Sequence, residues 1–339
     1  MIQTVLGPVA AAALGVCSMH EHLLSDARVL HAPARDETPP DGDRVTIANL
    51  GFARWNLLAL EDNLVLDDPE LAAAELGHAA EVGQRAVVDL TSWGLGPDYA
   101  GLPAIARAAG VDVVAGVGAY LDRPHPEWMA ELDDDALAAR FVAALEDEIA
   151  PGAGFRAGLL GIVGTSEPIT PSERRVLHAT AAAAGATGAA LTVRLDPSAQ
   201  RGIEVLELLE AAGCPAGQVI FGNVDEFLAD LGYLRALARS GATLEWCFGN
   251  EAYYRDGYKD PTDAERLTAL TTLLAENPSL AERAVLGCSV WTKTQLRAYG
   301  GMGYDHVLRR IVPELRRRGV QASTIEAMLV DNPARLLDR

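Results

Sequence analysis

Eight short apolar runs that alternate with helical patterns constrain the fold of this chain more than any other feature. Strands that alternate with amphipathic helices predict a parallel sheet with right-handed crossovers, and eight such units predict a closed barrel. An open doubly wound sheet is the alternative, but no GxGxxG motif follows an early strand. We therefore predict an α/β fold, a single-domain (β/α)8 TIM barrel over residues 1–339. The strand candidates are Leu14–Met19, Arg85–Leu90, Asp112–Val117, Gly158–Val163, Ala190–Arg194, Gln218–Gly222, Ala242–Trp246 and Ala284–Cys288.

Two long connections interrupt this pattern, at residues 31–68 and 248–261. Both follow predicted strands, so both are expected at the carboxyl ends of the strands, where barrel enzymes place their active sites. Loops of this length are commonly lids over a site, and a plain surface insertion is the alternative. Helical patterns occupy Glu70–Val82, Pro171–Ala186, Gly202–Ala212, Phe227–Ser240, Thr262–Glu276, Asp305–Arg318 and Ala322–Leu337.

The composition argues against several classes of binding partner. The formal net charge of -19 disfavours nucleic acid and anionic membranes, whose phosphates would be repelled. The four cysteines form no CxxC pair, and no apolar run approaches the roughly 20 residues that span a bilayer. The opening segment has no basic start and is a poor signal peptide. We expect a cytoplasmic protein that acts on a small molecule, and a homodimer, because dimers are common among barrels.

The strongest candidate for a functional site is His20-Glu21-His22, at the end of the first predicted strand. Alternation along a strand directs both imidazoles to one face, here the barrel interior. In a barrel enzyme such an HxH pair commonly holds a divalent metal. A hydrogen-bonded histidine pair inside the core is the alternative.

Further segments give this chain a specific resemblance. TVLGPV, LGVCSMHEHLLSD, NLGFARWN, VVDLTSWGLG, GVGAYL, GLLGIVGTSEPITPSE, GNVDE, PTDAER, YGGMGYDHVLRRIVPELRRRGV and DNPARLL occur in this order over nearly the whole chain. In these segments the chain resembles the phosphotriesterase-related family of the amidohydrolase superfamily. The resemblance implies a metal-dependent hydrolase of lactones or phosphotriesters. It also implies two divalent metals held by HxH on strand one, a carboxylated Lys or a Glu on strand four, His on strands five and six, and Asp on strand eight.

Only two of these six positions keep their ligands. His20 and His22 match the family pattern, and the other four positions carry residues that bind metals poorly. Those four are Ile162 on strand four, Arg194 on strand five, Asn223 on strand six and Ser289 on strand eight. Isoleucine has no lone pair, and arginine is a fixed cation. Because a catalytic zinc needs about three good protein ligands and a water, we predict no family-type metal pair, and no cofactor.

The replacements suggest a rebuilt polar site. A guanidinium at position 194 takes over part of a metal's electrostatic task by binding an anionic oxygen. A histidine without metal serves as a general base near neutral pH. We therefore predict catalytic roles for His20, His22, Arg194 and Asn223, and for Tyr120, which matches a family tyrosine near the leaving group. The alternative for Arg194 is a structural ion pair with Asp196, Asp225, Glu167 or Glu245.

Other residues are weaker candidates for the substrate pocket. Ser289 stands in the strand-eight position, Glu245 lies near the end of the seventh predicted strand, and Trp93, Tyr254 and Trp291 are expected to line the mouth. The cysteine at position 288 is expected to point outward if Ser289 points inward.

Three functions remain open from the sequence. The first is a metal-independent enzyme that acts on a small anionic ester, lactone or amide, or carries out related acid–base chemistry. The second is a non-catalytic binding protein that kept the barrel. The third is a hydrolase with one metal on His20, His22 and a further ligand such as Glu245 or Cys247. We favour the first, because a decayed site would collect small apolar residues rather than Arg, Asn and Ser.

Overall fold

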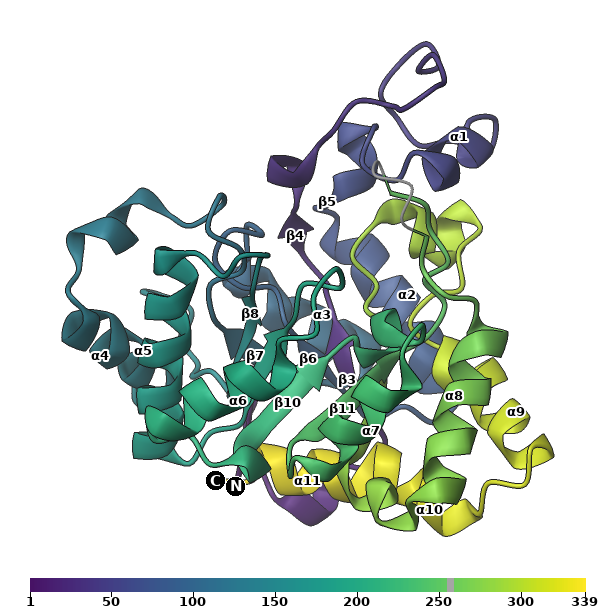
Figure 1. Ribbon diagram of the computed structural model, residues 1–339. Helices are drawn as coiled ribbons and strands as arrows, with labels where there is room; N and C mark the ends of the chain where they lie inside the picture. The colour runs from purple at the N-terminus through teal and green to yellow at the C-terminus, as the bar shows by residue number, and fades with distance from the viewer. Residues whose placement is uncertain (255–258) are drawn as a thin grey trace.

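Eight parallel strands form the centre of the molecule, as the computed structural model of residues 1–254 and 259–339 shows (Figure 1). The strands run side by side in the order of the chain and confirm the predicted barrel. They are β3 (Cys17–Glu21), β6 (Ala86–Asp89), β7 (Asp112–Val117), β8 (Leu159–Gly164), β9 (Leu191–Arg194), β10 (Val219–Gly222), β11 (Thr243–Cys247) and β12 (Ala284–Gly287). The first strand begins three residues later than predicted, so His20 lies inside it and His22 just beyond its end.

The barrel closes where β12 meets β3. The amide of Ser289 donates to the carbonyl of His20 at 2.8 Å, and the amide of His22 donates to the carbonyl of Val290 at 3.0 Å. Glycine at position 287 permits this approach, because a Cβ there would lie 3.0 Å from the Cβ of His20. The carboxylate of Glu21 reinforces the seam by accepting backbone N–H bonds at 3.0 and 3.2 Å from Cys288 and Val290, just after β12.

Helices cover the outside of the barrel (Figure 1). Their starts follow capping rules: Thr170 and Thr262 each form a capping box with a glutamate three residues later. The chain ends lie side by side, with the terminal amine 2.5 Å from Asp338. The helices are α1 (Leu50–Trp55), α2 (Pro69–Glu81), α3 (Leu102–Ala109), α4 (Asp134–Glu146), α5 (Pro171–Thr187), α6 (Gly202–Ala211), α7 (Leu231–Arg239), α8 (Asp263–Glu276), α9 (Val312–Arg317), α10 (Ala322–Glu326) and α11 (Asn332–Leu337).

The two predicted closing helices are each interrupted by a wide turn of the π type, at Val307–Ile311 and Ala327–Asp331. Each wide turn ends shortly before a proline, Pro313 or Pro333, at the start of the next α-helical segment. Proline has no N–H to donate to the preceding turn, which explains why the regular ladder breaks there. No helix in the described ranges is long and apolar enough to cross a membrane.

Two small antiparallel pairs complete the fold. The pair β1 (Ile2–Thr4) and β2 (Gly7–Val9) begins the chain, and β4 (Ser25–Asp26) pairs with β5 (Val65–Leu66). The second pair brings the two ends of the 31–68 connection together, and this connection, with α1, rises at the top of Figure 1. Part of the other predicted loop, residues 255–258, lies outside the described residues.

Candidate active site

The two histidines of the HxH motif face each other inside the barrel mouth. Their Nε2 atoms are 3.3 Å apart, and both residues are buried. The Nδ1 atom of His22 lies 3.0 Å from the hydroxyl of Thr91, which follows β6. Alternation along β3 therefore brings the two rings to one point, as predicted.

Glu245 on β11 lies behind His20 rather than in the substrate pocket. Its Oε1 atom is 2.6 Å from Nδ1 of His20, and because a carboxylate only accepts, the proton of this bond belongs to Nδ1. The thiol of Cys247 donates to the same oxygen at 3.0 Å. The prediction that Glu245 binds substrate or pairs with Arg194 is thus wrong, because β11 directs this carboxylate at the far edge of the imidazole ring.

The surroundings shift the pKa values of the two histidines in opposite directions. Burial lowers the pKa of His20, but the charge and hydrogen bond of Glu245 outweigh burial and hold that pKa above its ordinary value. Burial, reinforced by the charge of His20, holds the pKa of His22 well below its ordinary value. The pair therefore takes up a proton on His20 first, while His22 stays neutral.

A cavity of about 540 Å³ opens onto this pair. Eight of the ten predicted catalytic and substrate-binding residues line it: His20, His22, Arg194, Asn223, Tyr120, Ser289, Tyr254 and Trp291. Leucines at positions 30, 58, 95 and 121 supply much of the remaining wall. The cavity therefore combines a polar floor at the strand ends with apolar sides.

Arg194 borders this cavity but is engaged by a carboxylate that the sequence did not indicate. Its Nη2 atom lies 2.6 and 2.9 Å from the two oxygens of Glu226, which follows β10. None of the four partners expected from the sequence makes this ion pair. Burial alone would lower the pKa of the Arg194 guanidinium, but the carboxylate of Glu226 raises that pKa well above its ordinary value. The side chain therefore stays a cation at the cavity wall.

Asn223 and Ser289 share an uncommon backbone conformation. Their φ angles are +51° and +48°, in the left-handed region that disfavours residues other than glycine and asparagine. The Oδ1 atom of Asn223 is buried and has no hydrogen-bond partner among the described residues. The hydroxyl of Ser289 lies 3.5 Å from Nε2 of His20. Both side chains thus stand at strand ends with a positive φ, which is unfavourable for Ser289 and tolerated by Asn223.

Trp93 does not line the cavity, contrary to the prediction. Its ring stacks on Phe141 with centroids 5.1 Å apart and meets Trp128 edge-on at 4.9 Å. The residue follows β6 but turns toward the helical layer, where α4 offers an aromatic partner. Cys288 also points outward, as expected, with its sulfur 3.8 Å from the carbonyl of Tyr304.

The side chains present do not fit the metal pair that the resemblance implies. Ile162, in the position of the bridging acid, is buried and lines the cavity as an apolar wall. Arg194 places a permanent cation in the same cavity, where it would repel a divalent ion. Ser289 and Asn223 offer only neutral oxygens. No chemical step is therefore assigned to a metal pair.

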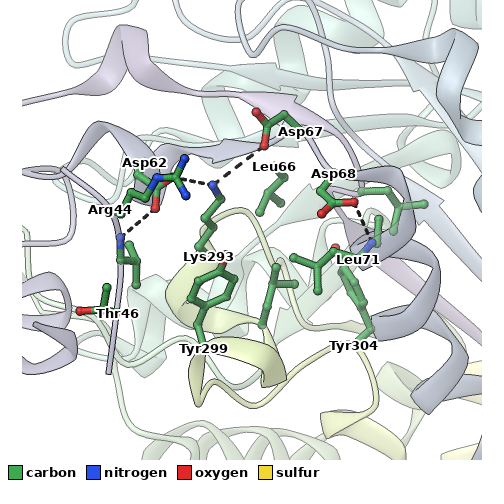
Figure 2. A pocket seen from close by; sticks show the side chains of 14 residues that line it. Arg44, Thr46, Asp62, Leu66, Asp67, Asp68, Leu71, Lys293, Tyr299 and Tyr304 are labelled. Atoms are coloured by element: carbon green, nitrogen blue, oxygen red, sulfur yellow. Dashed lines mark hydrogen bonds and ion pairs between the residues drawn. The ribbon is translucent and has the colours of Figure 1, made fainter. Parts of the chain in front are cut away.

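A second cavity, of about 520 Å³, lies between α2, the 31–68 connection and the segment after β12 (Figure 2). Lys293 reaches into it between Asp62, at 2.7 Å, and Asp67, at 3.9 Å. Asp68 caps α2 from its edge. The Lys293–Asp62 ion pair thus joins the connection to the segment after β12, and no predicted site residue lines this cavity.

Comparisons with known proteins agree with the fold and the motifs. The sequence model of the Phosphotriesterase family matches residues 1–337. An N-acetyltaurine hydrolase of Tetraodon nigroviridis is 32% identical over 343 aligned residues, which span 98% of this chain and 96% of the relative. The crystal structure of a resiniferatoxin-binding protein from Rhodobacter sphaeroides superposes with a TM-score of 0.93 at 34% identity, over 99% of this chain and 94% of that one. The phosphotriesterase homology protein of Escherichia coli, crystallised with phosphate in its active site, gives a TM-score of 0.77 at 27% identity, over 96% and 99%.

The fold and the relatives define a hydrolase built on a (β/α)8 barrel. The chain belongs to the phosphotriesterase family. In its site an ion-paired arginine, Arg194, stands where the resemblance implies a histidine ligand.

Proposed function

We propose that this protein hydrolyses a small anionic amide, ester or lactone without a metal ion. His20 is the general base, Arg194 binds the anionic group of the substrate, and Asn223 and Tyr120 hydrogen bond to the reacting carbonyl. The observation that carries this proposal is that all four side chains border one cavity, at whose floor Glu245 orients His20.

The histidine pair provides the proton transfer. With Nδ1 of His20 bonded to Glu245, the Nε2 atom of the ring faces the cavity side and accepts a proton from the attacking group. Glu245 stabilises the imidazolium that forms, because opposite charges at 2.6 Å attract strongly in a buried site. His22 is the neutral neighbour that exchanges this proton at 3.3 Å.

The positive charge of Arg194 supports a preference of the site for an anionic substrate. Glu226 engages one nitrogen of the guanidinium, whose fork carries five N–H donors in all. A carboxylate or sulfonate at the cavity wall would meet the remaining donors. The partial neutralisation by Glu226 limits the affinity for the anion, which favours release of the product.

The relatives named N-acetyltaurine hydrolase support an amide among the three substrate types. N-acetyltaurine joins an amide to a sulfonate by a short carbon spacer. Arg194 and Gly222 are partners in the β9–β10 ladder, so Asn223 stands one residue beyond Arg194 on the adjacent strand. Neighbouring strands lie about 4.8 Å apart, a span that suits an anion held close to its amide.

The test compares N-acetyltaurine with N-ethylacetamide, which has the same amide and no charge. We expect measurable hydrolysis of the anion, a much lower kcat/KM for the neutral amide, and loss of this preference in Arg194→Ala. Arg123→Ala is the matched control, because Arg123 borders the same cavity but is exposed. Unchanged discrimination in Arg194→Ala would exclude Arg194 as the anion binder.

A single-metal hydrolase is the second candidate, and one observation favours it. The Nε2 atoms of His20 and His22 are 3.3 Å apart, a separation that suits two ligands about 2.0–2.1 Å from one tetrahedral ion. Glu245 and Cys247, the further ligands expected from the sequence, lie instead at Nδ1 on the other edge of the His20 ring, at 2.6 and 3.9 Å. Elemental analysis of the purified protein decides between the candidates: stoichiometric zinc or manganese, with activity lost on chelation, would replace the metal-free proposal. A cytoplasmic location and a homodimer stay predictions.

A further inference from the structure

Three side chains from different strands form a line at the floor of the cavity. Oε1 of Glu245 lies 2.6 Å from Nδ1 of His20, and the Nε2 atom across the same ring lies 3.5 Å from Oγ of Ser289. All three are buried, with exposed fractions of 0%, 1% and 5% in that order. An acid on one ring nitrogen and a hydroxyl on the other is the arrangement that activates a serine.

We propose that Ser289 is the nucleophile of a Ser289–His20–Glu245 triad, and that hydrolysis passes through an acyl-enzyme. This inference rests on the proposed hydrolase and identifies the group that His20 deprotonates. Ser289 and His20 are then catalytic residues, and Glu245 is a positioning residue that fixes the ring and stabilises its cation.

The backbone of Ser289 supports this role. Its φ of +48° lies in the left-handed region, where serine is uncommon, and two hydrogen bonds hold it there. The Ser289 amide donates to the carbonyl of His20 at 2.8 Å, and the side chain of Gln295 donates to the Ser289 carbonyl at 3.2 Å. Strained residues persist when their surroundings fix them, and they concentrate at active sites. Nucleophilic serines on other folds also stand on sharp, strained turns at strand ends.

The Nε2 atom of His20 has a second neighbour besides Ser289. Nε2 of His22 is 3.3 Å away, slightly nearer than Oγ of Ser289. The hydroxyl of Thr91 fixes the other edge of the His22 ring at 3.0 Å. Contacts between a nucleophile and its base are often loose without substrate and tighten when it binds. We therefore expect the Ser289 contact to shorten as the carbonyl enters.

Asn223 completes the arrangement. Its carboxamide is buried at the cavity, and Oδ1 has no partner in the ranges that the structure describes. The two ends of a carboxamide are nearly isosteric, so the unpaired end can present an N–H to the oxyanion. An asparagine in that role is worth about 10²–10³ in kcat in a known serine hydrolase.

In the proposed reaction His20 carries one proton in acylation and one in deacylation. Oγ of Ser289 attacks the carbonyl carbon and forms a C–O bond, while its proton passes to Nε2 of His20. The bond from this carbon to the leaving nitrogen or oxygen breaks, and His20 gives that proton to the leaving group. Water then attacks the acyl-enzyme and passes one proton to His20. The C–O bond to Ser289 breaks, and the serine oxygen takes the proton back as the acid departs.

The experiment uses phenylmethanesulfonyl fluoride, which sulfonylates activated serines and releases fluoride. We expect one adduct per chain by intact-protein mass spectrometry, mapped to Ser289 by peptide analysis. Labelling should be lost in Ser289→Ala and His20→Gln, and should persist in Ser25→Ala. Ser25 is the matched control, because it lines the same cavity and is equally buried at 5%, but its hydroxyl has no partner among the described residues.

Turnover of N-acetyltaurine by Ser289→Gly supplies the second measurement, since glycine accepts a positive φ and this variant is expected to fold. We expect kcat to fall at least 10³-fold. Absence of the Ser289 adduct in the natural protein, or turnover that survives in Ser289→Gly, overturns the triad. In the latter case hydrolysis by a water activated by His20 stands, so the proposed function survives. Labelling of Ser289 without hydrolysis of any anionic substrate would instead reject the proposed function and keep the activated serine.

Discussion

Two substitutions at Ser289 separate the effect of its strained backbone on stability from the effect of its hydroxyl on activity. Ser289→Ala and Ser289→Gly both remove the hydroxyl, but only glycine removes the Cβ that makes φ = +48° unfavourable. The change in activity should therefore be the same in the two variants. The change in stability should differ, and its sign is the informative quantity.

The magnitude follows from two opposing effects. At an ordinary position glycine is less stable than alanine by roughly 0.5–1 kcal/mol, because the unfolded chain gains freedom. In the left-handed region the Cβ of an L-residue costs roughly 1–2 kcal/mol. The difference gives Ser289→Gly an advantage over Ser289→Ala of about 0–1.5 kcal/mol, with a midpoint of about 0.75 kcal/mol. The usual order of the two residues is thus reversed at this position.

Urea unfolding at one pH, followed by tryptophan fluorescence and by circular dichroism, measures this difference as a shift of the midpoint at constant slope. Hydrolysis assays on the same preparations give kcat. An alanine variant more stable than the glycine variant by roughly 0.5–1 kcal/mol, the ordinary difference, would show that the positive φ costs nothing. Such a result would refute the inference that Ser289 is held in a strained, functional conformation.

Three further predictions concern the charges around the site. Glu245→Gln removes the charge that raises the pKa of His20, so the acidic limb of the kcat/KM profile should move to lower pH, while the plateau falls about 10²–10⁴-fold. Glu226→Gln leaves Arg194 without its counter-charge and should lower KM for an anionic substrate several-fold, whereas Arg194→Ala should raise it about tenfold or more; steady-state kinetics over a range of substrate concentrations checks both. Burial raises the pKa of Glu21 from 4.5 to about 7, so between these values the folded state binds the extra proton and the free energy of unfolding declines with rising pH, by up to about 3 kcal/mol. In Glu21→Gln this decline should be absent from urea titrations between pH 4.5 and 7, and an identical slope in both proteins would contradict it.

The barrel could be predicted from local pattern alone. Each of the eight strands is a largely buried run of four to six residues, and each overlaps one range predicted without knowledge of its neighbours. The prolines at positions 313 and 333, which follow the two wide turns, lie inside ranges that the sequence predicts as continuous helices. A proline near a helix start is tolerated, so the sequence does not separate a new first turn from a broken one.

The contacts within the site could not be predicted from local sequence patterns. Glu245 is 225 residues from His20 in sequence, and Ser289 is 269 residues from it. Closure of the barrel determines which strand ends meet and how far along the barrel axis each side chain lies. The same limit explains the partner of Arg194: Glu226 reaches it because a positive φ at Asn223 turns the chain after β10. A side-chain pattern does not reveal such a turn.

The substitutions in the metal positions are coherent when their charges are considered together. In the family pattern, acids on strands four and eight are stabilised by the divalent ions that they bind. Without those ions, a buried carboxylate at either position would be left unpaired, at a cost of several kcal/mol. Ile162 and Ser289 remove both charges, while Glu245 at the floor is compensated by His20 at 2.6 Å. Arg194 is likewise balanced by Glu226. Glu245 and Arg194 thus each have a partner of opposite charge, and this pairing, rather than any single substitution, supports the proposed metal-free site.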